Sequence, residues 1–534
     1  MSQSLSILMA QINPTVGAID ANKTKIIDII KKHQLDHDII VFPELVLTGY
    51  PPEDLLLRDE LFLQVEEALK DIQSITANCH VIIGHPSIDN GNFYNGASIF
   101  ANNTKISVYH KQHLPNYGVF DEKRYFTKGT TSPCIFSIKN QRVGLCICED
   151  LWLPGPVEQL VDANVNLMIS INASPFDYNK YSLRESLLKE HAKKGLSIIY
   201  VNQVGGQDEL VFDGQSLAIN KAGKICARAP AFIEHLQTIT FQNNNFESEI
   251  TPLLPHLPLV YKALLCGLKD YVEKNKFKSV LLGLSGGIDS ALTLCLAVDA
   301  IGAENVHAVF MPSRYSLDIS ANDAKLQAET MRVKYSILPI EPTFKSFLNT
   351  LAPSFNGLEP DITEENLQAR IRGVLLMALS NKTKSMLLCT SNKSETAVGY
   401  STLYGDMAGG FAILKDVLKT LVYDLAIYRN TISSVIPERV ITRAPTAELK
   451  HNQKDEDSLP PYTNLDAIIK SFMENEMSAK EIISSGQKEE DVLRVINLIK
   501  LNEYKRRQSA PGVKITPCAF GKDWRFPITS GFKI

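Results

Sequence analysis

The sequence predicts an α/β protein with more than one domain. Short apolar runs alternate with longer amphipathic segments through the first half of the chain, and the second half continues in the same way. Such alternation of strand and helix patterns is typical of sheets covered by helices. The chain has 534 residues. That length exceeds what one hydrophobic core usually serves, so about two to four domains are expected.

In the first half, strands are predicted where the apolar runs are short, and helices where apolar residues recur at helical spacing. The expected strands are residues 5–10, 39–42, 81–84, 144–148, 167–171 and 198–201, and the expected helices are 22–33, 61–77 and 182–194.

A break in composition divides the chain near residues 242–258. This stretch is rich in Asn and then in Pro and shows little periodicity, which is typical of a linker. We therefore predict a first domain at 1–245, a linker at 246–260 and a second domain at 261–534.

The second domain is predicted to begin with a helix at 259–274, which leads into a strand at 279–284. A helix follows at 289–301 and stops at Gly302. Residues 451–462 are polar, charged and Pro-rich, so we expect a surface loop or lid there.

Composition excludes several classes of protein. A hydrophobic content of 44% and a charged content of 21% are ordinary for a globular protein. The net charge of −4 argues against a dedicated nucleic-acid binder. No apolar run approaches the roughly 18 residues of a membrane helix. The start of the chain has no basic segment followed by a cleavage site, so no signal peptide is expected. The nine scattered cysteines show no metal-binding spacing and favour a reducing compartment, the cytoplasm.

The most informative stretch is GLSGGIDS, residues 283–290, between a predicted strand and a predicted helix. Glycines let a backbone approach an anion closely, and the N–H groups of the following helix start point towards it. No Lys precedes Ser290, so this is not a Walker A loop. The alternative is a βα turn in which small residues only allow tight packing.

Three residues of the first half suggest a second chemical centre. Glu44, Lys111 and Cys148 each lie at or near the end of a predicted strand, where α/β folds gather catalytic groups. Cys148 would be the nucleophile, Glu44 its general base, and Lys111 the cation that stabilises an oxyanion. Alternatively Glu44 caps a helix, Lys111 is a surface charge and Cys148 is a buried apolar residue, as is expected for Cys146.

The segments around these residues carry a family resemblance. FPELVLTGYPPEDLL, KQHLPNYGVFDEKRYF, ICEDLW and INASPF occur in order and resemble the nitrilase-type glutaminase domains. The resemblance implies an α-β-β-α sandwich over about residues 4–240, with catalytic roles for Glu44, Lys111 and Cys148. It also implies an assisting carboxylate at Glu122 and glutamine contacts at Tyr117, Ser174 and Lys180. Glu149 and Asp150 are interpreted as solvated or capping carboxylates.

The GLSGGIDS segment resembles the loop of the N-type ATP pyrophosphatases, which implies a Rossmann-like parallel α/β domain that splits ATP to AMP and pyrophosphate. Residue 2 is Ser, whereas the asparagine synthetases carry Cys there, and the Gly-x-Cys-x-Gly turn of the guanylate synthetases is absent. A nitrilase-type domain ahead of this ATP site is similar to the glutamine-dependent NAD+ synthetases. ENLQARIRG, CTSNKSE, GYSTLYGDMAGGFAILKDVLKT, RAPTAEL and NEYKRR resemble the synthetase domain of that family.

This resemblance implies specific binding residues. The ATP contacts would be Gly283, Leu284, Ser285, Gly286, Gly287, Ile288, Asp289, Ser290, Thr390, Lys419 and Thr446. The deamido-NAD+ contacts would be Asn366, Arg370, Glu395 and Lys505, and the magnesium ligands would be Asp289 and Glu395. Alternatively Arg370 and Arg372 form a solvated helix face, and Lys505 belongs to a charged helix end. Leu403 departs from a Lys of the ammonia-only enzymes.

The implied activity is an ATP- and magnesium-dependent ligase that makes NAD+ from deamido-NAD+ with ammonia from L-glutamine or from solution, in a homo-oligomer. One alternative is an amidase with a nucleotide-binding regulatory half, but regulation alone would not need the carboxylates of Asp289 and Glu395. A second alternative is a nucleotide-sensing scaffold without activity, but such a scaffold would not need Glu44, Lys111 and Cys148.

Overall fold

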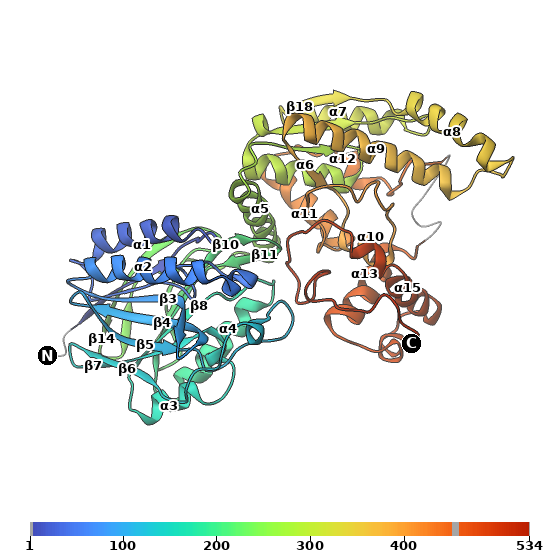
Figure 1. Ribbon diagram of the computed structural model, residues 1–534. Coiled ribbons are helices and arrows are strands. Elements are labelled where there is room, and N and C mark those ends of the chain that lie inside the picture. The colour runs from blue at the N-terminus through green and yellow to red at the C-terminus, as the bar shows by residue number, and fades with distance from the viewer. Residues whose placement is uncertain (1–3, 451–458, 533–534) are drawn as a thin grey trace. The chain divides into compact units, whose positions relative to one another are not determined.

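The structure is a computed structural model that describes residues 4–450 and 459–532. The chain forms two compact units, Met1–Pro255 and His256–Ile534 (Figure 1). The point of division falls inside the stretch predicted as a linker, 246–260. No helix in the described ranges is long and apolar enough to cross a membrane.

The first unit contains two large sheets and a small one. The first sheet has seven strands in the order β15 (Asn245–Glu247), β14 (His235–Gln242), β1 (Leu5–Gln11), β2 (Ile39–Val41), β3 (His80–Asp89), β4 (Asn92–Ala101) and β5 (Thr104–His110). The second has six strands in the order β13 (Ile225–Arg228), β12 (Leu217–Ile219), β9 (Ser197–Asn202), β8 (Leu167–Asn172), β7 (Gln141–Ile147) and β6 (Cys134–Ile138). The hairpin of β10 (Val204–Gln207) and β11 (Leu210–Asp213) forms the third.

Strand alternation explains how the two large sheets pack. Successive side chains of a strand point to opposite faces. In β1, Ile7 and Met9 pack in a core shared with Leu145 and Ile169 of the second sheet. Leu8 lies in a different core, together with apolar residues of α1 and α2. The four central strands β1–β4 therefore contribute to two cores, one between the sheets and one under the helices.

Helices cover the outer faces and complete an α-β-β-α sandwich, which confirms the predicted fold class. Helices α1 (Ile19–His33) and α2 (Asp59–Ile75) lie side by side on the first sheet (Figure 1). Helices α3 (Pro156–Asp162) and α4 (Lys180–Ala192) share a core with the outward side chains of the second sheet. Short 3₁₀ turns occur at Glu53–Leu57, Glu122–Arg124 and Cys148–Leu151.

The predicted strands and helices of this unit all occur, with ends shifted by a few residues. The strands β4–β6 and β10–β15 were not predicted. Two of them have unfavourable composition: NFYNGASIFA in β4 contains Asn and Gly, and VGGQ in β10 contains two Gly, and both residue types are depleted in strands. Pairing with neighbouring strands outweighs that local preference.

The second unit contains a five-stranded parallel sheet, which confirms the predicted Rossmann-like class. The order is β18 (Lys334–Ile337), β17 (Val306–Phe310), β16 (Val280–Gly283), β19 (Met386–Cys389) and β20 (Phe411–Ala412). The chain continues to one side of β16 and later returns to its other side. In open α/β sheets ligands bind at such a switch point, outside the carboxyl ends of the strands. The segment 283–290 leaves β16 at that place.

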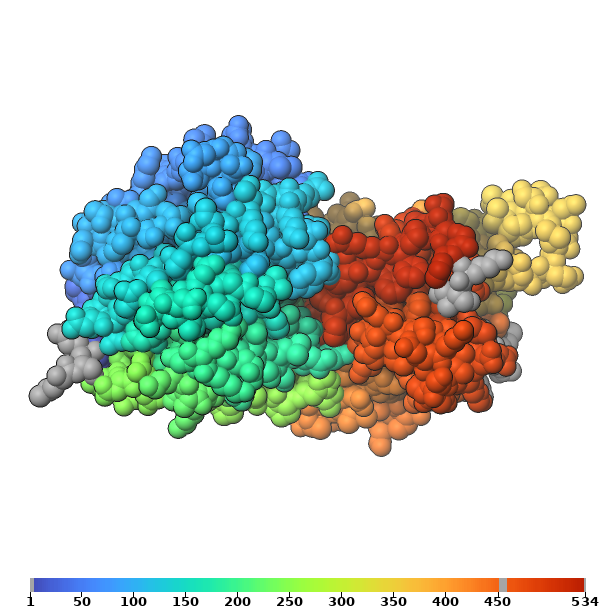
Figure 2. Space-filling view, turned by 90° about the horizontal axis from the view of Figure 1, so that it is seen from below, coloured from blue at the N-terminus to red at the C-terminus, as the bar shows by residue number. Residues whose placement is uncertain are grey.

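Helices of the second unit fall into three groups. Those that accompany the sheet are α5 (His256–Lys274), α6 (Ile288–Ile301), α7 (Asp318–Thr330), α8 (Glu341–Phe355), α9 (Ile362–Thr383), α11 (Lys419–Ile432) and α12 (Glu438–Thr442). A separate apolar cluster joins α10 (Lys393–Val398), α13 (Tyr462–Ile469), α14 (Ala479–Ser484) and α15 (Glu489–Leu501). The short α16 (Glu503–Arg506) follows. Helix α8 and the start of α9 protrude from the rest of this unit (Figures 1 and 2).

Two candidate active sites

Cys148 lies one residue beyond β7, although the predicted strand included it. It opens the turn Cys148–Leu151 with a φ of +44°, a conformation that a non-glycine residue adopts only when its surroundings enforce it. Asp150 supplies that enforcement. Its carboxylate accepts from the N–H groups of Ile147 at 3.1 Å, Gln112 at 3.0 Å and His113 at 2.9 Å.

Asp150 is therefore a capping carboxylate, as one of the two interpretations expected, but it is fully buried rather than solvated. Glu149 is also buried, so the solvated interpretation is wrong for both residues.

Glu44 lies three residues beyond the end of β2. Gly84 of β3 lets the two strands approach here, since a Cβ on it would lie 2.4 Å from the carbonyl oxygen of Pro43 and 2.5 Å from the nitrogen of Leu45. The Glu44 carboxylate accepts from Asn95 Nδ2 at 2.7 Å and from the N–H of Ala173 at 2.9 Å.

Lys111 lies between two carboxylates. Its Nζ is 2.6 Å from Glu44 Oε1 and 2.8 Å from Glu122 Oε1, and all three side chains are at most 5% exposed. Tyr50 donates to Glu122 Oε1 at 2.9 Å and Asn95 Nδ2 reaches Glu122 Oε2 at 3.4 Å. A buried ammonium with two carboxylates leaves one net negative charge when all three groups are ionised.

The electrostatics of this cluster shift three pKa values. Burial and the Glu44 carboxylate raise the pKa of the Cys148 thiol well above its ordinary value, and Lys111 only partly opposes them. Burial raises the pKa of Glu122 to about 7, against the lowering effect of Lys111. Burial opposes the ammonium form of Lys111, but Glu122 and Glu44 outweigh it and raise its pKa. The thiol therefore rests protonated, beside a carboxylate placed to act on it.

The three predicted glutamine contacts lie around this cluster. The half-exposed Tyr117 donates to Glu149 Oε2 at 3.1 Å. Ser174 is buried directly after Ala173, which contacts Glu44. The Lys180 ammonium lies 4.7 Å from the centre of the Trp152 ring, and burial lowers its pKa.

At the second site, the serines of segment 283–290 hold its backbone in a turn. Ser290 Oγ accepts from the N–H of Ser285 at 3.2 Å and donates to the carbonyl of Gly287 at 3.0 Å. Gly286 has a φ of +82°, and a Cβ on it would lie 2.4 Å from the carbonyl oxygen of Ser320. Only glycine fits there, because of both the positive φ and the close approach of Ser320.

A pocket of about 280 Å³ opens beside this turn. It is lined by every member of segment 283–290 except Gly286, and by Thr390, Glu395, Lys419 and Thr446. Predicted ATP contacts from distant parts of the chain thus converge on one pocket.

Asp289 and Glu395 face each other across the ammonium of Lys419. Lys419 Nζ is 2.5 Å from Asp289 Oδ2 and 3.4 Å from Glu395 Oε1. Burial opposes the charged form of Lys419, but both carboxylates raise its pKa. Magnesium is commonly bound by one or two carboxylates together with substrate phosphates. These two hard oxygen donors, already placed around a cation, fit that requirement.

Asn392 connects the two carboxylates. Its side chain accepts from the N–H of Glu395 at 2.9 Å, which caps α10, and its Nδ2 donates to Asp289 Oδ1 at 2.8 Å. The sequence signal for Asn392 is the N-x-x-E capping pattern at 392–395.

Segment 443–448 closes another side of the pocket. Arg443 donates to the carbonyl of Gly286 at 3.1 Å and to Ser320 Oγ at 2.9 Å. Glu448 accepts from the N–H of Leu317 at 3.1 Å. This segment thereby fixes both the glycine turn and the start of α7.

The predicted dinucleotide contacts other than Glu395 do not line this pocket. Asn366 accepts from Thr402, Arg370 donates to the Leu403 carbonyl, and Lys505 donates to the carbonyls of Gly399 and Ser401, at 2.7–3.3 Å. All three hold segment 399–403. Its Tyr400 lines the pocket, as do the nearby Gly405 and Asp406.

One alternative placed Arg370 and Arg372 on a solvated helix face. For Arg372 this alternative is wrong. Its side chain lines the pocket, and its Nε donates to the carbonyl of Met311 at 3.1 Å. Among the described residues no carboxylate forms an ion pair with its guanidinium, and burial lowers its pKa to about 10. A cation in this position is available to an anionic ligand.

Comparisons with known proteins agree with this geometry. The carbon–nitrogen hydrolase family matches residues 7–248 and the NAD synthase family matches residues 260–509. The glutamine-dependent NAD+ synthetase of Acinetobacter baylyi is 46% identical over 99% of both chains. The chain belongs to the glutamine-dependent NAD+ synthetase family. The Aquifex aeolicus member is 44% identical over 99% of this chain and 100% of its own.

A solved member of this family has the same fold over the whole chain. The glutamine-dependent NAD+ synthetase of Acinetobacter baumannii, in complex with ADP, has a TM-score of 0.81 and 45% identity over 99% of both chains. The family resemblance inferred from the sequence motifs is therefore confirmed.

Proposed function

We propose that the two sites divide one synthesis between them. The first releases ammonia from L-glutamine, and the second uses ATP to convert the nicotinate carboxylate of deamido-NAD+ to the amide of NAD+, the last step of NAD+ biosynthesis. The enzyme is a carbon–nitrogen ligase. The observation that carries this proposal is the pairing, in one chain, of a buried Glu–Lys–Glu cluster beside Cys148 with a glycine turn beside two carboxylates.

At the first site, Cys148 attacks the side-chain amide of glutamine. The thiol proton passes to Glu44, because the neutral thiol is the resting form and only the thiolate attacks well. The Lys111 ammonium stabilises the oxyanion, and Glu122 holds that ammonium in place. Ammonia leaves with a proton returned by Glu44, and water then hydrolyses the thioester. We propose Tyr117, Ser174 and Lys180 as contacts of the glutamine substrate.

At the second site, the N–H groups of the glycine turn and the start of α6 receive the ATP phosphates. The residues proposed for ATP are 283–290 with Thr390, Lys419 and Thr446. The reaction transfers AMP to the nicotinate carboxylate and releases pyrophosphate, and ammonia then displaces AMP.

Transfer of AMP to a carboxylate brings negative charges together, so the site must supply positive charge. Bound magnesium would neutralise the phosphates, and Asp289 and Glu395 are the residues proposed to hold it. Lys419 and the turn N–H groups supply the remaining positive charge from the protein.

For deamido-NAD+ we propose Asn366, Arg370, Glu395 and Lys505. Asn366, Arg370 and Lys505 all contact segment 399–403, whose Tyr400 lines the pocket, and this supports a second substrate position beside that of ATP. We further propose a domain boundary within 246–260, a homo-oligomer and a cytoplasmic location, where ATP is supplied.

The test separates the two sites by the nitrogen source. Cys148→Ala should lower glutamine-dependent NAD+ formation by roughly a thousandfold or more and leave ammonia-dependent formation intact. Asp289→Ala should lower synthesis with both nitrogen sources while glutamine hydrolysis survives. Assays of NAD+ and glutamate with each source measure this. A folded Cys148→Ala protein that also fails with saturating ammonia would contradict the division.

A further inference from the structure

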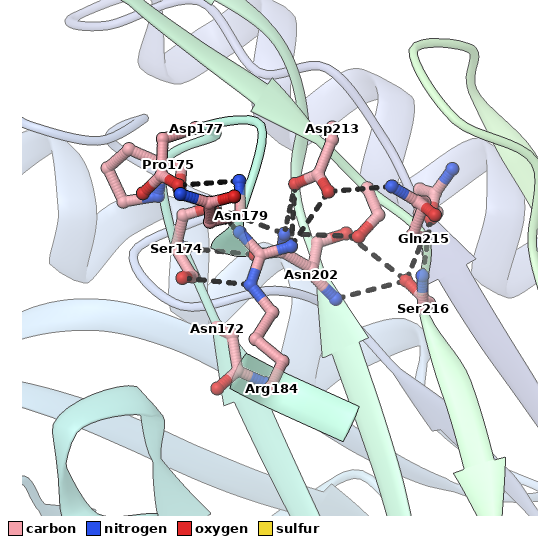
Figure 3. Close-up of polar contacts among 12 residues, drawn as sticks. Asn172, Ser174, Pro175, Asp177, Asn179, Arg184, Asn202, Asp213, Gln215 and Ser216 are labelled. Carbon is pink, nitrogen blue, oxygen red and sulfur yellow. Dashed lines mark hydrogen bonds and ion pairs between the residues drawn. The ribbon is translucent and has the colours of Figure 1, made fainter. Parts of the chain in front are cut away.

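A buried polar network lies behind the loop that carries Ser174. Figure 3 shows Arg184 of α4 directed at Asp213, the last residue of β11, and at the loop after β8. The guanidinium Nη1 is 2.7 Å and 2.8 Å from the two carboxylate oxygens of Asp213, and both side chains are at most 2% exposed.

The same guanidinium holds the backbone of the loop. Nη2 donates to the carbonyls of Ser174 at 2.8 Å and Pro175 at 3.1 Å, and Nε donates to Ser174 Oγ at 3.2 Å. The N–H of Ser174 donates to Asn202 Oδ1 at 2.9 Å. The N–H, carbonyl and hydroxyl of Ser174 therefore all contact the network.

The loop connects this network to the reacting groups. Ala173, immediately before Ser174, donates its N–H to the Glu44 carboxylate at 2.9 Å. A shift of the loop would move both the Ser174 hydroxyl and the hydrogen bond that orients Glu44.

We propose that Arg184 and Asp213 form a positioning pair for the glutaminase site. The ion pair fixes the Ser174 loop, so that the bound glutamine is correctly placed relative to Glu44 and Cys148. Neither residue touches the substrate. The inference rests on the proposed glutaminase function of the first unit, and it assigns a role to two residues outside the catalytic cluster.

Physical reasoning favours positioning over simple stabilisation. Removing two charges from water is costly, and a buried pair often stabilises a fold no better than apolar residues of the same shape would. Two nitrogens of Arg184 donate to backbone carbonyls and a hydroxyl of one loop. These hydrogen bonds are not needed if Arg184 only packs α4 against the sheet. Apolar residues such as Leu188 already attach α4 to the sheet.

The experiment separates stability from substrate binding. Arg184→Met leaves the Asp213 charge unpaired, so it should lower the melting temperature and raise the KM for glutamine at least about tenfold. The double variant Arg184→Met/Asp213→Asn removes both charges. It should regain much of the lost melting temperature but keep the raised KM, because nothing then holds Ser174. If Arg184→Met does not fold, Arg184→Lys and Asp213→Asn replace it as the single variants whose melting temperature and KM for glutamine are measured.

Three controls complete the design. Leu188→Ala, on the same helix, should lower the melting temperature without raising the KM for glutamine. Ser174→Ala and Arg184→Met should be non-additive in KM, since both remove the same contact. Ammonia-dependent NAD+ formation should be unchanged in every variant.

A folded double variant with the wild-type KM would overturn the proposal and leave the pair a structural role only. Additive effects of Ser174→Ala and Arg184→Met on KM would overturn it as well. Failure of the glutaminase assignment is distinguishable, because Cys148→Ala would then retain glutamine hydrolysis.

Discussion

Lys111 lies within hydrogen-bonding distance of Glu44 and Glu122, so the protonation of one carboxylate affects the other. While Glu122 is protonated, the ammonium acts on Glu44 alone and makes it a weaker base. When Glu122 ionises, its negative charge offsets Lys111 and makes Glu44 a better proton acceptor for the thiol. The pKa of Glu122, raised to about 7, places this change near neutral pH.

We therefore predict that kcat/KM for glutamine hydrolysis rises as the pH increases through about 7. The rate rises with pH because Glu122 is ionised above its pKa, and its charge then helps Glu44 to accept the thiol proton. Below that pKa Glu122 is protonated and this help is lost. In Glu122→Gln the rate should be lower and this rise should disappear. Hydrolysis measured from mildly acidic to mildly alkaline buffer tests the prediction. An unchanged rise in Glu122→Gln would assign it to another group.

Arg372 offers a positive charge to the pocket of the second unit without a carboxylate partner among the described residues. A hydrogen bond to a charged group contributes about 1.5–3 kcal/mol. Arg372→Gln should therefore raise the KM for ATP or for deamido-NAD+ by roughly tenfold to a hundredfold, with both nitrogen sources. Initial rates over a range of each substrate show which one it contacts.

Arg314→Gln is the matched control for Arg372→Gln, because Arg314 already pairs with Glu341 at the surface of the same unit. Its KM values should stay near those of the unchanged enzyme. Equal KM values for Arg372→Gln and Arg314→Gln would show that the pocket cation does not contact a substrate anion.

At the scale of the elements, both sites are built from short segments that follow strands. The turn after β7 carries Cys148, the turn after β2 carries Glu44, and the turn after β16 carries the glycines. After β16, Gly286 permits a positive φ, and after β7 the Asp150 carboxylate accepts the N–H groups that hold the turn. The chemistry is thereby fixed by the rigid sheets.

The N-cap of α10 gives a prediction at this scale. Asn392→Ala removes the cap, which typically costs about 1 kcal/mol, and also removes the donor to Asp289 Oδ1. Synthesis with either nitrogen source should fall, whereas glutamine hydrolysis should not. Ser478→Ala is the matched control, because Ser478 caps α14 in the same way and contacts neither carboxylate. It should lower stability similarly and leave synthesis unchanged. Equal synthesis rates in the two variants would show that Asn392 acts only as a cap.

Local sequence patterns were enough to predict the apolar strands and amphipathic helices, but not the partners that distant segments supply. The strand β4 contains Asn and Gly, and only its pairing with β3 and β5 makes it a strand. For the same reason Asn95 was missed, although it contacts Glu44 across 51 positions of sequence. Arg184 and Asp213 lie 29 positions apart, and no local pattern links them. The sequence offers one indication of this pair: Asp213 directly follows the apolar residues of VFDGQS, where a carboxylate needs a buried partner.

At the scale of the whole molecule, one unit releases the nucleophile that the other consumes. Lys393 forms buried ion pairs with Asp416 and Glu474 within the second unit, and the buried Arg184–Asp213 pair lies within the first. Each unit thus has its own core and its own buried charges, which is why variants at one site are expected to spare the chemistry at the other.

The division of labour requires that ammonia reach the second site as a neutral amine. Ammonia released to bulk water would be protonated, and ammonium is no nucleophile. We therefore predict that glutamine-derived nitrogen enters NAD+ in preference to ammonia from the buffer, and that hydrolysis accelerates when ATP and deamido-NAD+ are bound. The measurement supplies isotopically labelled ammonium with unlabelled glutamine and follows the label in NAD+ by mass spectrometry. Cys148→Ala is the control, since all of its NAD+ should be labelled. Label entering the product of the unchanged enzyme in proportion to the free ammonia pool would show that the nitrogen equilibrates with solvent between the two reactions.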